Sequence, residues 1–152
     1  MELAIMIGLP ASGKTTFCKK LKQEGWVIVS PDEIRLTLHG KPFDKEYEDQ
    51  VWSIARVMAE ILLSQGQKVC IDATNINRKS RKPWAEMAKK HLIPLKMFAM
   101  ETPYETCLKF DSKRKNPLGE DIIKKFHERF EQFEEEEVAG PYIWVPIKRE
   151  PK

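Results

Sequence analysis

The sequence predicts a single α/β domain built around a parallel sheet of four or five strands. Short apolar runs alternate along the chain with longer amphipathic stretches, which is typical of a parallel sheet covered by helices. The first apolar run leads directly into a glycine-rich segment and then into an amphipathic one. The 152 residues contain no internal repeat, low-complexity segment or long linker, so we expect one domain over residues 1–152.

The expected strands are the short apolar runs. Residues 2–7 are almost continuously apolar, as a strand buried on both faces should be. Three further strands are expected at 26–29, 68–71 and 94–100. A fifth is expected at 142–145, where the prolines at 141 and 146 favour an edge position over a central one.

The expected helices carry apolar side chains at spacings of three and four. Residues 44–64 have the strongest pattern, with Val51, Ile54, Met58 and Ile61 on one face. The other helices are expected at 14–24, 32–38, 79–90, 103–113 and 120–136. A basic loop at 113–119 separates the last two and includes a proline and a glycine.

The composition restricts the class of protein. No apolar run is long enough to span a bilayer, and the first residues lack a basic leader and a cleavage site. The three cysteines are scattered and odd in number, which predicts reduced thiols in a cytoplasmic protein. The net charge of +3 is too small to establish a nucleic-acid partner, although the acidic run 134–137 leaves the rest of the chain more basic.

The glycine-rich segment Gly8-Leu-Pro-Ala-Ser-Gly-Lys-Thr15 has the pattern of a phosphate-binding loop, and it lies after a strand and before a helix. Its backbone N–H groups and the positive end of the next helix are expected to bind phosphate oxygens. Lys14 should reach the β- and γ-phosphates, and the Thr15 hydroxyl should bind Mg²⁺. The expected ligands are ATP, or another nucleoside triphosphate, and Mg²⁺. The predicted nucleotide contacts are Gly8, Pro10, Ala11, Ser12, Gly13, Lys14, Thr15 and Thr16.

Asp32 and Arg35 follow the second strand and, three residues apart, share one face of the expected short helix. A carboxylate at this end of the sheet can accept a proton from an attacking hydroxyl, and an arginine can bind a phosphate of the acceptor. The pair is also compatible with an ordinary helix start, in which Asp32 is a cap or first-turn acid and Arg35 is its surface partner. Composition alone favours that structural interpretation.

Asp72 follows the third strand, in the segment Asp72-Ala-Thr-Asn75. An acid in that place commonly holds Mg²⁺ or its water, and Asn75 can orient substrate. A capped turn into the next helix explains Thr and Asn equally well, and it is the preferred explanation for Asn77.

Arg114 lies in the basic loop between two helices. A mobile loop that carries an arginine can stabilise the charge of a transferring phosphate, but a solvated charged turn is the commoner meaning of such a segment. The basic residues Arg78, Lys79, Arg81 and Lys82, with Trp84 nearby, are compatible either with a groove for a nucleic-acid strand or with a solvated helix face.

Together these segments resemble the P-loop kinase domain of the 5′-hydroxyl polynucleotide kinases, over nearly the whole chain from residue 8 to about residue 133. Three features carry the resemblance. They are the loop from Gly8 to Phe17 with Pro10 in it, the Asp32-x-x-Arg35 pair, and the Asp72-Ala-Thr-Asn75 segment. Arg114 then resembles the lid arginine of that family, which contacts the donor phosphates.

The resemblance implies an adenylate-kinase-like P-loop fold with a helical lid around residues 110–120. It also implies transfer of the γ-phosphate of a nucleoside triphosphate to the 5′-hydroxyl of DNA or RNA. Catalytic roles are then expected for Lys14, Asp32, Arg35 and Arg114. Substrate contacts are expected from Asp32, Arg35, Asp72 and Asn75, and metal contacts from Thr15 and Asp72.

The chain departs from the family pattern at Phe110, where many members carry another arginine one turn before the lid arginine. Relatives are often joined to a phosphatase or ligase domain, whereas this sequence corresponds to the kinase module. Two other classes of function stay open. One is a P-loop kinase that phosphorylates a nucleoside or sugar, and the other is a non-catalytic nucleotide-binding module. Oligomeric state and the choice between DNA and RNA are not determined by these motifs.

Overall fold

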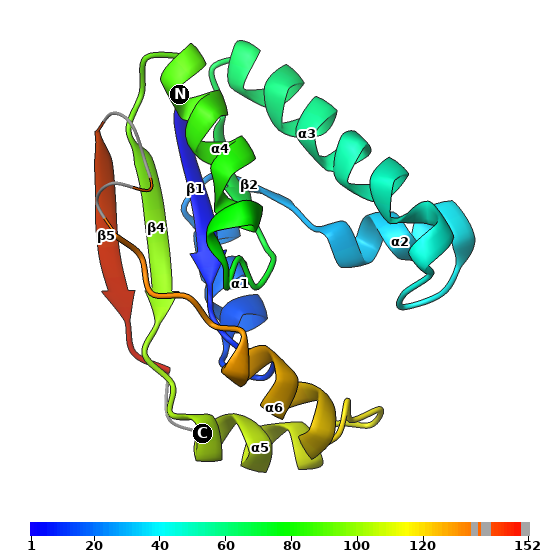
Figure 1. Cartoon of the computed structure of the whole chain (residues 1–152). Helices are drawn as coiled ribbons and strands as arrows, with labels where there is room; N and C mark the ends of the chain where they lie inside the picture. Colours follow the sequence, from blue (N-terminus) through cyan, green and yellow to red (C-terminus); the bar gives the residue numbers. More distant parts are fainter. Residues whose placement is uncertain (135–136, 138–140, 150–152) are drawn as a thin grey trace.

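The computed structural model describes residues 1–134, 137 and 141–149. Its centre is a sheet of five parallel strands in the order β2-β3-β1-β4-β5 (Figure 1). The strands are β1 Glu2–Ile7, β2 Trp26–Val29, β3 Lys68–Ile71, β4 Leu95–Met100 and β5 Tyr142–Ile147. The predicted α/β fold with a P-loop and a parallel sheet is therefore confirmed.

Helices cover both faces of the sheet. They are α1 Lys14–Gln23, α2 Pro31–His39, α3 Glu48–Ser64, α4 Arg78–Lys90, α5 Tyr104–Ser112 and α6 Glu120–Glu128, with a 3₁₀ turn η1 at Lys45–Tyr47. Alternate residues of β1 point to opposite faces. Ala4 and Met6 pack in one cluster with Leu21 of α1, whereas Leu3 and Ile5 pack in another with α3 and α4.

The helices α5 and α6 lie beyond the carboxyl ends of the strands, at the bottom of Figure 1. They share a small core of their own, in which Cys107 and Ile123 are buried against Leu9 at the start of the glycine-rich loop. This arrangement holds the predicted lid region against the end of β1.

The predicted helix 120–136 is wrong in its second half, because α6 ends at Glu128. The chain then turns back to the loop between β3 and α4, where the Glu131 N–H donates to the carbonyl of Ile76 at 2.7 Å. Phe130 and Phe133 still pack against the core, but from an irregular segment and not from one face of a helix. Residues 135–136 lie outside the described part of the chain.

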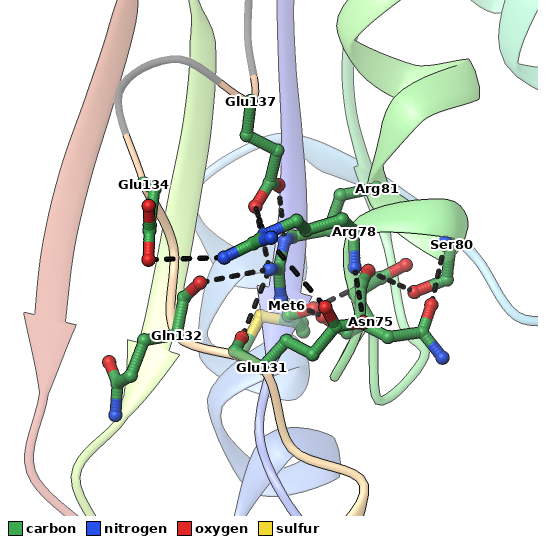
Figure 2. Close-up of polar contacts among 10 residues, drawn as sticks. Met6, Asn75, Arg78, Ser80, Arg81, Glu131, Gln132, Glu134 and Glu137 are labelled. Carbon is green, nitrogen blue, oxygen red and sulfur yellow. Dashed lines mark hydrogen bonds and ion pairs between the residues drawn. The ribbon is translucent and has the colours of Figure 1, made fainter.

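A buried arginine explains why the chain leaves the helix (Figure 2). Arg81 of α4 is 1% exposed and binds the Glu137 carboxylate through Nε at 2.6 Å and Nη2 at 2.8 Å. It also donates to the carbonyls of Asn75, Glu131 and Gln132. A continued α6 would lose these contacts, which join α4, the loop after β3 and the segment before β5.

Two residues of the suggested nucleic-acid groove are therefore in the interior. Arg81 binds the chain's own carbonyls and Glu137, and Trp84 is fully buried in the core. Arg78 is half exposed, but its guanidinium pairs with Glu131, Glu134 and Glu137. Besides Arg78, only Lys79 and Lys82 of this set are exposed. A strand-binding groove formed by the whole set is ruled out for this face.

Smaller differences concern the ends of elements. The strand at 142–145 continues through Pro146 to Ile147, which is possible because β5 is an edge strand and pairs only with β4. The predicted helix 44–64 splits into η1 and α3, with the Asp44 side chain capping η1. In the described residues, none of the helices has both the length and the apolar content that crossing a bilayer requires.

Candidate functional site

The glycine-rich loop connects β1 to α1, as its motif predicts. Ala11 and Gly13 have positive φ values of 64° and 102°, which wrap the backbone around a centre. A Cβ at Gly8 would lie 2.7 Å from the Ser12 hydroxyl and 3.1 Å from Met100 Cβ. Any side chain at Gly8 would therefore displace the loop.

The first turn of α1 keeps its positive end available. It contains no acidic residue, and Gly13 as its N-cap has no side chain to bind the free N–H groups. Helix N-termini of this kind bind anions, because free N–H groups and the helix dipole point at the ligand. Thr15 and Thr16, at the start of α1, are exposed.

The Lys14 side chain folds back over the loop. Its ammonium group donates to the carbonyls of Gly8 at 3.0 Å and Leu9 at 2.6 Å. Burial lowers the pKa of Lys14 to about 8, against an opposing effect of the nearby Asp72 carboxylate. A bound phosphate would favour the charged form of this amine and offer it a better acceptor than a carbonyl.

Asp72 stands at the carboxyl end of β3, where its N–H donates to the carbonyl of Val29 at the end of β2. Burial raises the pKa of the Asp72 carboxyl, and the charge of Lys14 opposes that rise. A carboxylate in this setting gains from a cation beside it, which suits the predicted metal ligand. The metal roles of Thr15 and Asp72 stay predictions.

Asp32 and Arg35 lie on one face of α2, and the Arg35 Nη1 donates to the Asp32 carboxylate at 2.7 Å. The two side chains share one face of the helix, as predicted, and their contact also fits the structural alternative, in which Arg35 is the partner of a first-turn acid. Asp32 does not cap the helix, because the Ser30 hydroxyl accepts the Glu33 N–H in that role. The Asp32 side chain is 83% exposed and that of Arg35 is 14% exposed, so the acid faces solvent and the arginine is held in place.

Glu48 at the start of α3 holds that arginine. Its two carboxylate oxygens accept from Arg35 Nε at 2.9 Å and Nη2 at 2.8 Å, in a bidentate pair. The pair with Glu48 is the largest cause of the raised pKa of Arg35, whose guanidinium also lies 5.8 Å from the ring centroid of Trp52. The sequence motifs did not predict a role for Glu48, because this residue lies in a different element from Arg35 and belongs to no local pattern.

Asp111, the second overlooked residue, organises the loop that carries Arg114. Its buried carboxylate accepts the N–H groups of Leu118 at 3.1 Å and Gly119 at 3.0 Å, and so closes residues 112–119 into a compact loop. The Arg114 guanidinium lies 3.9 Å from the same carboxylate and is 45% exposed. The positive charge of Arg114 contributes to the lowered pKa of Lys14, which places it within electrostatic reach of the glycine-rich loop.

Asn75 occupies the base of the loop. It is 2% exposed, and its side-chain amide donates to the Met6 carbonyl at 2.8 Å. The neighbouring Thr74 carbonyl accepts the Gly8 N–H at 3.0 Å. Residues 74 and 75 therefore brace the glycine-rich loop from below, and a substrate contact of Asn75 stays a prediction.

Lys14, Asp32, Asp72 and Arg114 share one electrostatic environment. The pKa of Lys14 is influenced by the other three, and that of Asp72 by Lys14 and Asp32. The tertiary structure thus gathers side chains from the ends of β1, β2 and β3 and from the α5–α6 loop. A phosphate-binding loop, the cation of Arg114 and an exposed acid that pairs with Arg35 are groups of the kinds that phosphoryl transfer uses.

Known proteins are similar to this chain in sequence and in fold. A protein of Autographa californica nuclear polyhedrosis virus, named "Putative bifunctional polynucleotide kinase/RNA ligase", is 27% identical over 145 residues, which cover 85% of this chain and 21% of that protein. A chain in the solved structure of the Pnkp1/Rnl/Hen1 RNA repair complex matches with a TM-score of 0.70 and 26% identity, covering 84% of this chain and 43% of that one. The resemblance to polynucleotide kinases is confirmed, although this chain spans only about a fifth of the viral protein.

A more distant likeness supports the fold. Kti12 of Chaetomium thermophilum, solved in complex with ADP-AlF3, has a TM-score of 0.73 at 16% identity, covering 95% of this chain and 88% of that one. Residues 3–133 match the model of the family described as AAA domain. Because that match includes the phosphate-binding loop and most of the chain, this protein belongs to the AAA domain family of P-loop proteins.

Proposed function

We propose that this chain is an ATP-dependent kinase that transfers the γ-phosphate to the 5′-hydroxyl of a polynucleotide, with Mg²⁺ as cofactor. The main support is the Asp32–Arg35 pair, held by Glu48 within electrostatic reach of Lys14. The similarity to a named polynucleotide kinase/RNA ligase and to a chain of an RNA repair complex adds the acceptor class.

In this mechanism the phosphate-binding loop and Lys14 hold the triphosphate, and Thr15 and Asp72 would hold Mg²⁺, which supplies charge neutralisation. Asp32 removes the proton of the acceptor hydroxyl as its oxygen forms a bond to the γ-phosphorus. The bond between that phosphorus and the bridging oxygen of the β-phosphate breaks, and ADP leaves. Arg35 binds the acceptor phosphate next to the hydroxyl, and Arg114 stabilises the charge on the transferred group.

The exposure of Asp32 and the burial of Arg35 fit these two roles. An acid that must meet an incoming hydroxyl has to be accessible, and Asp32 is exposed. An arginine positions a phosphate best when its own guanidinium is held in place. The Nε and Nη2 of Arg35 donate to Glu48, and its Nη1 donates to Asp32.

The decisive experiment incubates the protein with γ-labelled ATP, Mg²⁺ and a panel of acceptors. The panel contains DNA and RNA oligonucleotides with a 5′-hydroxyl, the same oligonucleotides with a 5′-phosphate, nucleosides and sugars. We expect label only on the 5′-hydroxyl oligonucleotides, and none with the Lys14→Ala protein. Label on nucleosides or sugars alone would establish a small-molecule kinase instead. ATP binding without any labelled acceptor would favour a non-catalytic nucleotide-binding module.

Salt provides a second discriminator. Binding of a polynucleotide releases counterions, so its affinity should fall steeply between about 50 and 200 mM salt. Binding of a nucleoside or sugar acceptor releases no counterions, so its KM should change little over the same range of salt concentration. The comparison uses one ATP concentration well above KM, so that any salt effect on the donor does not contribute.

A further inference from the structure

Arg149, just after β5, reaches across the end of the sheet to the phosphate-binding loop. Its Nη1 donates to the Ala11 carbonyl at 3.1 Å. A Cβ at Gly13 would lie 2.9 Å from the same nitrogen, so the guanidinium lies directly against the loop at Gly13. Because Gly13 has no side chain, the guanidinium of Arg149, from near the C-terminal end of the chain, can lie against the loop.

The same guanidinium stacks on the lid helix α5. Its central carbon lies 3.7 Å from the ring centroid of Phe110. Such a contact attracts the cation to the ring and fixes the plane of the guanidinium. Arg149 therefore has a defined orientation, with the phosphate-binding loop at one end and Phe110 beneath its face.

One donor of this held guanidinium has no acceptor within the described part of the chain. Nε of Arg149 is buried and makes no hydrogen bond to any described residue. A buried charged donor without a partner is costly, and such atoms in folded proteins usually meet water, an ion or a ligand. The residue also lines a cavity of about 500 Å³, between the loop after β4, Phe110 and Lys148.

The positive charge of Arg149 adds to the positive charges of Lys14 and Arg114 around the phosphate-binding loop. The pKa of the Cys107 thiol is raised by burial, and three cations oppose that rise: Lys14, Arg149 and Arg114. All three are therefore close enough to act on one buried group. A site with three converging cations and a phosphate-binding loop favours a polyanionic ligand.

We propose that Arg149 binds the phosphates of the donor nucleotide, with Phe110 as the platform that orients its guanidinium. The unpartnered Nε and its neighbouring N–H group form the fork that suits a phosphate oxygen pair. Nothing in the glycine-rich motif points to Arg149, which lies 136 residues after Gly13. This inference rests on the proposed binding of a nucleoside triphosphate.

The test measures dissociation constants for ATP, ADP and adenosine by calorimetry. If adenosine binds too weakly for direct titration, its dissociation constant is measured by competition. The variants are Arg149→Ala, Arg149→Lys and, as a charge-matched control, Arg129→Ala at an exposed arginine beyond α6. We expect Arg149→Ala to weaken ATP binding about tenfold or more, as loss of a charged hydrogen bond should. Arg149→Lys should recover only part of the affinity, because an ammonium lacks the fork and the flat face.

Adenosine separates a phosphate contact from a structural effect. If Arg149 binds phosphates, Arg149→Ala should change adenosine affinity less than twofold, and Arg129→Ala should change ATP affinity less than twofold. Equal losses for ATP and adenosine, or ATP binding within twofold of wild type, would overturn the inference. Failure of the wild-type protein to bind ATP would overturn the proposed nucleotide binding itself. Thermal unfolding of the ligand-free Arg149→Lys protein shows whether the fold is retained.

Discussion

Glu48 and Arg35 form a bidentate ion pair between the start of α3 and the middle of α2, with N–O distances of 2.9 and 2.8 Å. The pair fixes the guanidinium so that its remaining Nη1 reaches Asp32 at 2.7 Å. A residue outside every recognisable motif therefore sets the geometry of the proposed acceptor site. This relationship makes Glu48 the first residue to test.

Replacing Glu48 by Gln should reduce polynucleotide phosphorylation about tenfold or more, through a higher KM for the acceptor. The amide keeps the shape of the side chain, but its nitrogen cannot accept, so one charged hydrogen bond is lost and the other is weakened, where each contributes about 1.5–3 kcal/mol. Steady-state kinetics with varied acceptor at saturating ATP measures the effect, and the exposed neighbour Asp49→Asn is the control. An unchanged acceptor KM would contradict the positioning role of Glu48.

Replacing Asp32 by Ala should abolish turnover and leave ATP affinity nearly unchanged, because the carboxylate serves the acceptor and not the donor. The exposure of its side chain implies little effect on folding. Labelled-phosphate transfer and calorimetric ATP binding are measured on the same preparation, with Glu33→Gln, the next acid of α2, as control. Near wild-type turnover of Asp32→Ala would show that another group accepts the proton.

ATP affinity should fall as the pH rises through about 8, the pKa to which burial lowers Lys14. Bound phosphates favour the charged amine, so nucleotide binding takes up a proton above that pH and weakens by up to tenfold per unit. Calorimetry between pH 7 and 9.5, in buffers of different ionisation enthalpy, measures both effects. The Lys14→Met protein should bind weakly with no such pH dependence, and an identical slope in that variant would exclude Lys14 as its source.

The same lowered pKa affects stability with a definite sign. Between about pH 8 and 10.5 the unfolded chain holds the Lys14 proton and the folded chain has lost it, so the Lys14 contribution makes stability rise with pH over that interval. Below pH 8 both states are protonated and the Lys14 contribution is constant. Nucleotide, which binds the charged form, should reduce this rise.

Replacing Arg81 by Met should destabilise the fold by about 3–5 kcal/mol, because it leaves the Glu137 carboxylate buried without its cation. Urea unfolding measures the loss. Lys82→Met, at an exposed position of the same helix, should stay within about 0.5 kcal/mol of wild type. If Arg81→Met is as stable as the control, the contacts of Figure 2 do not hold the segment after α6 against α4.

Much of the fold was predictable because it depends on local patterns. The continuous apolar run of β1 and the glycine-rich loop are present as predicted, and the spacing in 44–64 correctly predicted a helix. The predicted apolar face of that helix was wrong, because α3 buries Val51, Ala55, Ala59 and Leu63 and leaves Ile54, Met58 and Ile61 exposed. The end of α6 was not predictable. The spacing of Phe126, Phe130 and Phe133 is helical. The N–H of Glu131 nevertheless donates to the carbonyl of Ile76, and the carboxylates of Glu131 and Glu137 pair with Arg78 and Arg81 of α4.

The site shows the same division. Lys14, Asp32, Arg35, Asp72 and Arg114 were predicted from the sequence, since each lies at a fixed offset from a strand end or in a basic loop, and their roles stay predictions. Glu48 and Arg149 were not predicted, because their partners Arg35 and Ala11 lie in other elements and only folding brings them together. Asp111 was not predicted either, because its partners Leu118 and Gly119 lie only a few residues away but no motif marks a carboxylate that accepts backbone N–H groups across a loop. The local motif thus determined that a phosphate can bind. Long-range hydrogen bonds and burial decided how the surrounding arginines are oriented. They depend on atoms that are far apart along the chain and come close together only in the folded protein.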